Sequence, residues 1–410
     1  VTVTQNGELS VDELRVTGGS WTINEALAAS NGYEISGGAT LVQNAGLTLP
    51  SPDILVSNWT WRANLAQNWD TVEIVSGGVV THDANITDLV FTVTSLLIDG
   101  SSRIDVTSKG TLNGPPAYAG GSHGGRGGNY SGASLPTCGD LREPEALGGG
   151  GYGRRGGGRV KIVAGSVVLD GSLISSGQTG AYRAGGGAGG SIWLDVGTLS
   201  GTGSIRANGA ATGSYAGAGA GGRVAIYYDD ASGFDLSSGV RTVGGDSPHH
   251  ASYDGASGTI YLKDNAEALG RVVINNASQG SAGNSTDIAT TLVEPIVVNN
   301  AKVRFQGAVT SAVLSVTNGV VTLNAEATIA DLSQRGGSFT QTTNGLLSVT
   351  GMVVSNVNYT QGAGLTADSL SATGGSWAQN ATMTVLDDVT MDGGSWVLNT
   401  NQVLRTLGVT

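Results

Sequence analysis

One column of residues returns every 18 to 20 positions in the last third of this sequence, and it limits the possible folds more than any other feature. Each member sits in a similar short phrase, such as Thr-Gly-Gly-Ser-Trp or Asp-Gly-Gly-Ser-Trp. The first third repeats at the same period, beginning with Gly-Gly-Ser-Trp at positions 18–21. The members of the column are Val303, Val321, Phe339, Tyr359, Trp377 and Trp396.

A constant period of about 19 residues, built from short alternating strands and Gly, Asn and Ser turns, predicts a solenoid in which each period is one coil. Like residues then stack about 4.8 Å apart, aliphatic side chains inside and Asn and Ser at the turns. We therefore predict an all-β, single-stranded parallel β-helix of roughly 17 to 20 coils, about 80 to 95 Å long. A right-handed helix is favoured, because the chain lacks the strict six-residue aliphatic repeat of left-handed ones. A sandwich or a propeller fits this period less well.

The middle of the chain has a longer repeat. The phrases Gly-Arg-Val-Lys-Ile, Gly-Ser-Ile-Trp-Leu and Gly-Arg-Val-Ala-Ile place Val160, Ile192 and Val224 at intervals of 32 residues, and Ile260 follows 36 residues later. We interpret each unit as an ordinary coil with a long glycine-rich loop inserted at a shared corner, so that the loops line up on one face. This divides one continuous solenoid into coils 1–114, coils with inserted loops 115–275 and coils 276–410.

The glycine-rich loops allow two interpretations. They either pack together as extended polyglycine, helped by close backbone approach and positive φ angles, or are disordered as low-complexity sequence. A tyrosine that recurs at intervals of 30 and 33 residues favours order, because it could anchor each loop. These tyrosines are Tyr152, Tyr182 and Tyr215.

The composition excludes several classes of protein. A net charge of −12 repels phosphate backbones, so we expect no nucleic-acid binding. The single cysteine, Cys138, excludes an internal disulfide framework and a cysteine-rich zinc site. The sequence has no apolar run of 18 residues, so we expect no membrane insertion.

The glycine-rich block, roughly residues 115 to 275, resembles a block found in very large bacterial surface proteins. The phrases that carry the resemblance include Gly-Gly-Ser-His-Gly-Gly-Arg-Gly-Gly (120–128), Gly-Gly-Arg-Val-Ala-Ile-Tyr-Tyr (221–228) and Gly-Thr-Ile-Tyr-Leu-Lys (258–263). The flanking coils are similar in architecture to those of filamentous adhesins of the haemagglutinin type. The resemblance implies an elongated, extracellular, non-catalytic protein, and it assigns no functional residues.

Tryptophans of the repeat are candidate contacts for a glycan or a protein partner. Their flat rings can stack on sugars, and a ladder of them on an outer face would form an exposed apolar stripe. Their place in the repeat leaves open whether the ladder lies inside or outside. The five candidates are Trp21, Trp59, Trp61, Trp377 and Trp396.

A second candidate site combines acidic and basic side chains. We expect no cofactor, although carboxylates in a turn can share a cation such as calcium, and neighbouring arginines can hold an acidic glycan. The alternative is a solvated turn, with arginines that bond to loop carbonyls. The residues are Asp229, Asp230, Asp246, His249, Arg154 and Arg155.

Together these observations favour an extracellular or cell-surface structural protein that acts in adhesion or as a stalk, without enzymatic activity. Ordinary repeats at both ends mean that the chain is either a piece of a longer solenoid or associates end to end with itself. Other surface proteins or a polysaccharide are the further expected partners. The alternative function is a secreted polysaccharide lyase or hydrolase, or a glycan-binding module, on the same scaffold.

Overall fold

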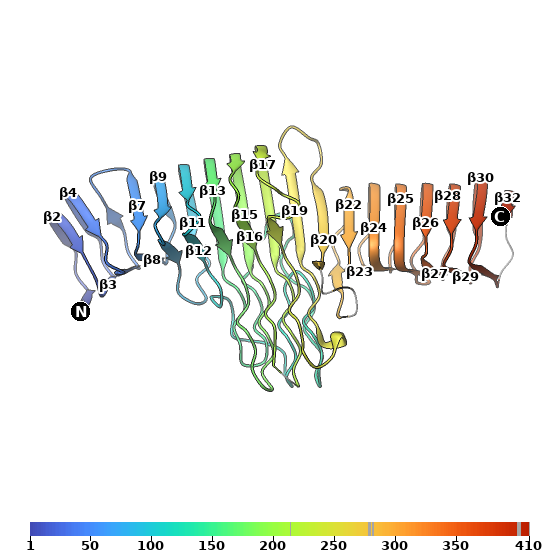
Figure 1. Cartoon of the computed structure of the whole chain (residues 1–410), viewed down its shortest axis with the longest axis horizontal. Helices are drawn as coiled ribbons and strands as arrows, with labels where there is room; N and C mark the ends of the chain where they lie inside the picture. The colour runs from blue at the N-terminus through green and yellow to red at the C-terminus, as the bar shows by residue number, and fades with distance from the viewer. Residues whose placement is uncertain (214, 278–279, 281–282, 400–402, 410) are drawn as a thin grey trace.

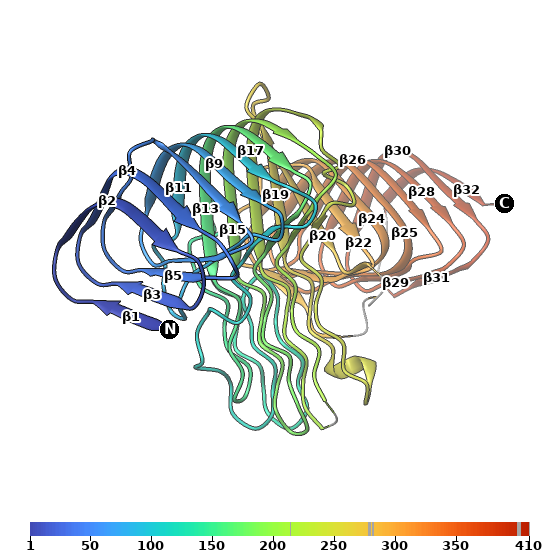
Figure 2. The ribbon, with the colours of Figure 1, turned by 60° about the vertical axis from the view of Figure 1, so that its left-hand side comes forward.

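The computed structural model is a parallel β-solenoid of about 20 turns, which confirms the predicted fold class. It describes residues 1–213, 215–277, 280, 283–399 and 403–409. The turns follow one another along a rod with the chain ends at opposite tips, and a slab of long loops hangs from its middle (Figures 1 and 2). In the described residues no helix is long and apolar enough to span a membrane.

Each N-terminal coil combines a long and a short strand. The short strands form one parallel sheet: β1 (Thr2–Gln5), β3 (Ser20–Ile23), β5 (Thr40–Gln43), β8 (Thr60–Ala63), β10 (Val79–Thr81), β12 (Arg103–Asp105), β14 (Ser172–Ile174), β16 (Ser204–Arg206) and β18 (Val240–Arg241). The long side of the coils comprises β2 (Leu9–Val16), β4 (Leu27–Ile35), β6 (Leu47–Thr48), β7 (Asp53–Ser57), β9 (Gln67–Val75), β11 (Val90–Ile98), β13 (Arg159–Leu169), β15 (Ser191–Ser200), β17 (Arg223–Gly233) and β19 (Thr259–Asp264).

The C-terminal coils repeat this plan after a hairpin. They comprise β20 (Arg271–Asn275), β21 (Thr286–Ile288), β22 (Ile296–Asn299), β23 (Lys302–Phe305), β24 (Val309–Leu323), β25 (Ala327–Gln341), β26 (Leu347–Ser355), β27 (Asn358–Gln361), β28 (Leu365–Thr373), β29 (Ser376–Gln379), β30 (Met383–Asp392), β31 (Ser395–Leu398) and β32 (Val403–Val409). One turn of 3-10 helix, η1 (Ala251–Tyr253), lies in a loop.

The predicted columns of like residues are present. Phe339, Tyr359, Trp377 and Trp396 are paired in successive strands, with ring centroids 5.1, 4.0 and 5.5 Å apart. The 32-residue phrases stack in the same way, because position 160 pairs with 192, 192 with 224 and 224 with 260. Near the N-terminus Trp21 shares its column with positions 41, 61 and 80. Each coil therefore buries its inner face only against its neighbours.

Turns between the strands use glycine and asparagine in defined roles. Gly375 has a φ of +75°, and a Cβ atom there would meet the carbonyl oxygen of Val357 at 2.3 Å, so only glycine fits. On the outside, the side-chain amides of Asn24, Asn44 and Asn64 each donate to the asparagine one coil earlier, at 2.6–2.8 Å. The side chains at these turns satisfy one another from coil to coil.

The hydrophobic core changes sides at the hairpin between β19 and β20. Ile260 belongs to the core of the N-terminal coils, whereas its neighbour Tyr261 belongs to the core of the C-terminal coils. β20 pairs antiparallel with β19 and places Val272 opposite Tyr261, so the second core begins on the other face of the shared sheet. The strand direction and the side of the core both reverse while the chain advances along the same rod (Figure 1). The sense of winding is therefore the same in both parts.

Four loops form a separate layer, which we name the glycine slab (residues 110–158, 175–190, 207–213, 215–222 and 242–258). They follow β12, β14, β16 and β18 and lead into β13, β15, β17 and β19, so they leave the solenoid at one shared corner, as predicted. In Figures 1 and 2 they lie side by side as extended arms below the rod. The slab is ordered polyglycine, and most of its arm residues are buried.

Hydrogen bonds define the conformation of the arms. In the arm 217–222, amides 217 and 220 donate to the first loop, 218 and 221 to the fourth, and 219 and 222 to the other arm of the same loop, at 2.7–3.0 Å. Every third amide of the arm therefore donates to the same neighbouring segment, and three residues per turn is the period of a polyproline II helix. The arm glycines are needed for close approach and not for positive φ, which none of residues 217–222 has.

Candidate functional site

The tip of the glycine slab gathers the tyrosines that recur in the loops. Tyr152, Tyr182 and Tyr215 lie at successive loop turns, with 43%, 64% and 39% of their surface exposed. The Tyr182 and Tyr215 rings contact each other edge to face, with 5.8 Å between their centroids. The predicted anchoring role of these tyrosines is therefore limited to contacts between loop tips.

Rings from the first and fourth loops extend this contact into a larger cluster. Tyr130 lies 5.8 Å from Tyr215 and 5.3 Å from Tyr253, and His249 lies 4.8 Å from Tyr215 and 6.0 Å from Tyr253. Most of these ring pairs are edge-to-face or tilted, the arrangement that aromatic quadrupoles favour. We name this set the tip cluster: Tyr130, Tyr182, Tyr215, His249, His250 and Tyr253.

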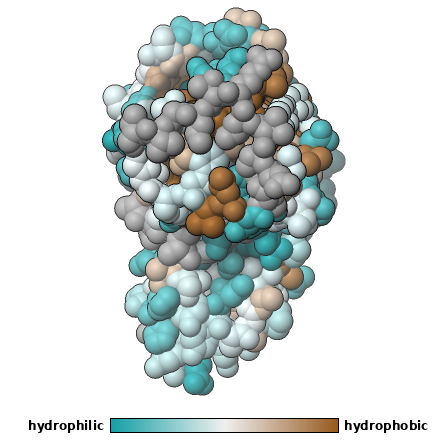
Figure 3. All heavy atoms as spheres, turned by 90° about the vertical axis from the view of Figure 1, so that its right-hand side faces the viewer, coloured by the Kyte–Doolittle hydropathy of each residue, from teal (hydrophilic) through white to brown (hydrophobic). Residues whose placement is uncertain are grey.

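The surroundings of the tip cluster carry charges of both signs, since Arg183 lies in the second loop and Asp246 in the fourth. The Arg183 guanidinium lies over the Tyr182 ring, 5.2 Å from its centroid. Arg154 follows Tyr152 closely in the first loop, whereas the Arg155 guanidinium donates to Asn85 and to the Gly110 carbonyl at the start of that loop. Seen from the C-terminal end, the lower part of the molecule is mostly pale to teal, so the slab surface on this side is neutral to hydrophilic (Figure 3). The tip offers aromatic faces and the Arg183 guanidinium on a polar surface.

Such a surface suits ligands that are both polar and flat-sided. Exposed aromatic rings supply large contact areas at low cost in conformational entropy, and guanidinium groups donate to acidic or hydroxyl oxygens. Each arm is fixed by backbone hydrogen bonds on several sides, so the rings are held at set spacings. Sequence reasoning identified Tyr152, Tyr182 and Tyr215 from their period, but it missed Tyr130 and Tyr253, which lie outside that period.

The predicted tryptophan contacts are wrong for three of the five residues. Trp59, Trp61 and Trp377 are only 0–3% exposed, because their column faces the core. Trp61 donates to the Gln43 side chain at 2.8 Å inside the solenoid. Trp21 and Trp396 are partly buried and pack against the two cores. The aromatic ladder therefore stabilises the coils and does not form an outer stripe.

The predicted acidic and basic site is divided between distant places. Asp229 and Asp230 are exposed on β17 in the solenoid wall, where Asn265 donates to Asp229 at 2.8 Å. Asp246 and His249 lie instead at the slab tip, in the fourth loop. Arg154 is in the first loop, and so is Arg155, which donates to the Gly110 carbonyl at 3.1 Å. The six residues do not form one site.

In the part of the chain that the structure describes, the acidic and histidine side chains are not grouped in a way that would hold a metal ion. Within residues 1–213, 215–277, 280, 283–399 and 403–409, no group of three or more His, Cys, Asp or Glu residues is arranged to hold a metal ion. The acidic turn around Asp235 is instead satisfied by the hydroxyls and amides of Ser237 and Ser238. We therefore assign no residues to calcium.

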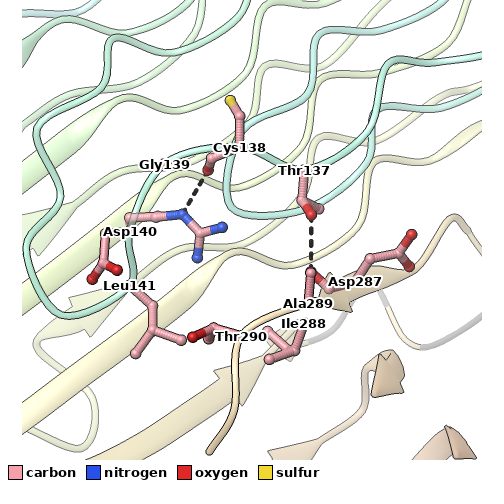
Figure 4. A pocket seen from close by; sticks show the side chains of 10 residues that line it. Thr137, Cys138, Gly139, Asp140, Leu141, Asp287, Ile288, Ala289 and Thr290 are labelled. Atoms are coloured by element: carbon pink, nitrogen blue, oxygen red, sulfur yellow. Dashed lines mark hydrogen bonds between the residues drawn. The ribbon is translucent and has the colours of Figure 1, made fainter. Parts of the chain in front are cut away.

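A second feature is the junction where the first loop covers the start of the C-terminal core. We name residues 137–145 the junction loop. Its Leu141 is 3% exposed and packs into the second core, and the Thr137 hydroxyl donates to the Asp287 carbonyl at 2.9 Å (Figure 4). Arg142 forms a two-pronged ion pair with the buried Glu294, at 2.6 and 2.9 Å.

A pocket of about 200 Å³ lies beneath the junction loop. Its lining includes Asp140, Leu141, Arg223, Asp287 and Ile288. Cys138 also lines the pocket, and Figure 4 shows its thiol pointing away from the Asp140 and Thr290 side chains.

Comparisons with known proteins complete the description of the site. No protein-family model, no curated protein and no solved structure matches the chain. The argument for function therefore depends on the geometry of the tip cluster and of the solenoid that carries it.

Proposed function

We propose that this chain is an extracellular structural and adhesive segment of a bacterial surface or filament protein, and that it contacts glycans through the tip cluster. The observation that carries the proposal is the convergence of six rings from four loops on one exposed tip. Packing inside the fold does not explain this convergence, since the arms are already held by backbone hydrogen bonds.

The solenoid supplies the support that an adhesive tip needs. Coils that pair strand to strand along one axis form a long rod, and the slab projects from its side (Figure 2). Binding groups on loops held by a rigid scaffold are a common arrangement for recognition surfaces. We infer that the rod positions the tip cluster away from the surface to which the protein is attached.

The enzymatic alternative gains less support than the binding one. Glycoside hydrolysis needs two carboxyl groups about 5 to 10 Å apart that face one substrate. Asp229 and Asp230 are adjacent in a strand, and successive strand residues face opposite sides, so the two carboxylates do not face one substrate. The tip cluster, in contrast, has aromatic rings and a guanidinium group that suit binding. Of the alternative functions, the glycan-binding module is therefore compatible with our proposal, and the lyase or hydrolase is not.

A glycan array probed with the intact chain tests the proposal. We expect binding to a defined group of glycans that falls at least tenfold in the double variant Tyr182→Ala, Tyr215→Ala, about 1.4 kcal/mol or more. The matched control is Leu269→Ala, which removes an exposed apolar side chain from the β19–β20 hairpin. Undiminished glycan binding by the tyrosine variant would refute the role of the tip.

End-to-end association stays a separate prediction. Parallel coils present unpaired backbone groups at any open end, which favours a non-closing contact between copies. Light scattering over a range of protein concentrations would detect it as a rise in mean mass. A constant monomer mass would contradict it without affecting the glycan proposal.

A further inference from the structure

The pocket under the junction loop contains a buried arginine without an acidic partner. Arg223 is 4% exposed, and its Nε donates to the Cys138 carbonyl at 2.9 Å while Nη1 donates to the Thr259 hydroxyl at 2.8 Å. These two bonds use two of the five N–H donors of a guanidinium. Among the described residues, no carboxylate lies within ion-pair distance of Arg223.

Other arginines near the junction differ from Arg223 in this respect. Arg159 occupies the equivalent position two strands earlier, since both pair with Ser191 in the strand between them, and it forms an ion pair with Glu145 at 2.9 Å. Arg126 and Arg304 share Asp287. A buried charge without a partner is costly, so an anion at Arg223 would relieve a real penalty.

The remaining donors of Arg223 face the pocket. Nη2 has no protein partner, yet it is not among the polar atoms sealed from solvent, whereas Nε2 of the neighbouring His123 is sealed. The Nη2 protons are therefore available to a ligand, next to the Nη1 group that binds Thr259. Two parallel N–H donors of this kind match the two oxygens of a carboxylate.

Nearby charges select a monovalent ligand. Asp287 accepts from Arg126 and Arg304, so these three groups together carry one positive charge. Asp140 accepts the backbone amides of residues 142 and 143 and contributes one negative charge. With Arg223, the charged lining residues and the two arginines paired with Asp287 sum to one positive charge, which suits a carboxylate better than a divalent phosphate or sulfate. The exposed Glu143 and the Arg142–Glu294 pair do not line the pocket.

His123 does not change this balance. Its Nδ1 lies 2.9 Å from the Gly189 carbonyl, and burial together with the charge of Arg223 lowers the pKa of His123 to about 4. The imidazole is therefore neutral at pH 7 and neither adds nor removes charge. Gly139, with a φ of +76°, brings the junction loop backbone close to both side chains.

We propose that this pocket is a binding site for a small monocarboxylate, held by the free edge of the Arg223 guanidinium. Leu141, Ile288 and Ala289 provide an apolar wall for the short carbon portion of such an acid. The volume of about 200 Å³ corresponds to several water molecules, enough for an acetate-sized ion with water or for one compact acid. The site is independent of the tip cluster and of the proposed glycan contact.

Calorimetric titration of the intact chain with sodium acetate tests the proposal, with sodium chloride and sodium phosphate at equal ionic strength as comparisons. We expect saturable acetate binding that exceeds both, and a loss of at least tenfold in Arg223→Met. The matched control is Arg206→Met, which removes an exposed guanidinium from β16 and should leave acetate binding unchanged. Equal heats for acetate and chloride, or wild-type affinity in Arg223→Met, would overturn the assignment.

A second variant keeps the test decisive if Arg223→Met fails to fold. Ala289→Glu adds a carboxylate at the exposed rim of the pocket and leaves Arg223 in place. We expect this internal carboxylate to weaken acetate binding at least tenfold, and unchanged binding would contradict the proposal. A parallel titration with glucuronate identifies the kind of acid that the pocket accepts. Glucuronate binding indicates that the natural ligand is a uronic acid. If acetate binds and glucuronate does not, the ligand is a smaller free acid.

Discussion

Gly219 lies in the middle of the glycine slab, and its replacement by alanine is the most direct test of the polyglycine packing. A Cβ atom at this position would lie 1.9 Å from the carbonyl oxygen of Gly187 and 2.4 Å from its carbonyl carbon. Ordinary contacts of a Cβ atom begin at 3.4 Å, so the two arms would have to separate by about 1.5 Å. Backbone atoms, unlike the end of a flexible side chain, cannot move aside locally.

The free-energy cost of Gly219→Ala can be worked out from the backbone hydrogen bonds around Gly219. The Gly219 amide donates to Ala210 at 2.9 Å, its carbonyl accepts from Gly245 at 2.7 Å, and Ala210 donates to Gly187 at 2.9 Å. Separating the arms weakens one or two of these bonds, at about 1 kcal/mol each. Overpacking adds about 1–3 kcal/mol. We therefore expect Gly219→Ala to destabilise the slab by about 2–5 kcal/mol.

Hydrogen exchange of the slab amides is the suitable assay, because a solenoid can open locally without unfolding as a whole. The matched control is Gly46→Ala, where an added Cβ has no atom within 4 Å and the backbone is not left-handed. That control should be neutral or slightly stabilising, by up to about 1 kcal/mol. If both variants exchange at the wild-type rate, the arms are not packed as described and the argument fails.

Three further predictions concern the cores and the junction. Trp377→Ala should destabilise the C-terminal coils by about 3–5 kcal/mol in urea denaturation, because the ring is buried in the aromatic column; a loss below about 1 kcal/mol would contradict its core role. Glu294→Gln should cost roughly 3 kcal/mol by removing the charge that pairs with Arg142, and an unchanged urea midpoint would argue against that pair. Because the pKa of His123 falls to about 4 on folding, below about 6.5 in the unfolded chain, the unfolded state binds the extra proton. Stability should therefore decrease as the pH falls from about 6.5 to 4, and thermal unfolding of His123→Asn should show a weaker decrease; an equal decrease in both proteins would refute this assignment.

Much of the fold could be predicted from the sequence because solenoid coils repeat their contacts. A period of about 19 residues places Tyr359 over Phe339 and Trp377 over Tyr359 without knowledge of any long-range contact. The position of the glycine-rich loops followed from the same reasoning, since each lies between two recognisable strands. Neither inference needed the details of side-chain packing.

The change of core side was not predicted, although β17 and β19 contain unbroken apolar runs, Val224 to Tyr228 and Ile260 to Leu262, that are a sequence signal for it. Ordinary strands of this chain alternate buried and exposed residues, whereas Arg223 to Ile226 and Thr259 to Leu262 are buried at every position. Runs that are buried on both faces are typical of a strand with a layer on each side. Tyr261 and Ala225 looked like outward residues because the period alone assigns one inner face to every coil.

In the glycine slab, the residues of the arms and the residues of the tip have different roles. The arm residues hold the slab together, and the tip residues are available to bind a ligand. Its arms are joined through backbone amides and carbonyls, so their sequence must be glycine or another small residue but carries little further information. The tip residues bear no comparable packing constraint: Tyr182 is 64% exposed, and its ring contacts come from other loop tips. Substitutions at the tip should therefore alter binding with little effect on folding, whereas substitutions in the arms should do the reverse. This division follows from the polyglycine geometry, and it is why we assign recognition to the tip and not to the solenoid wall.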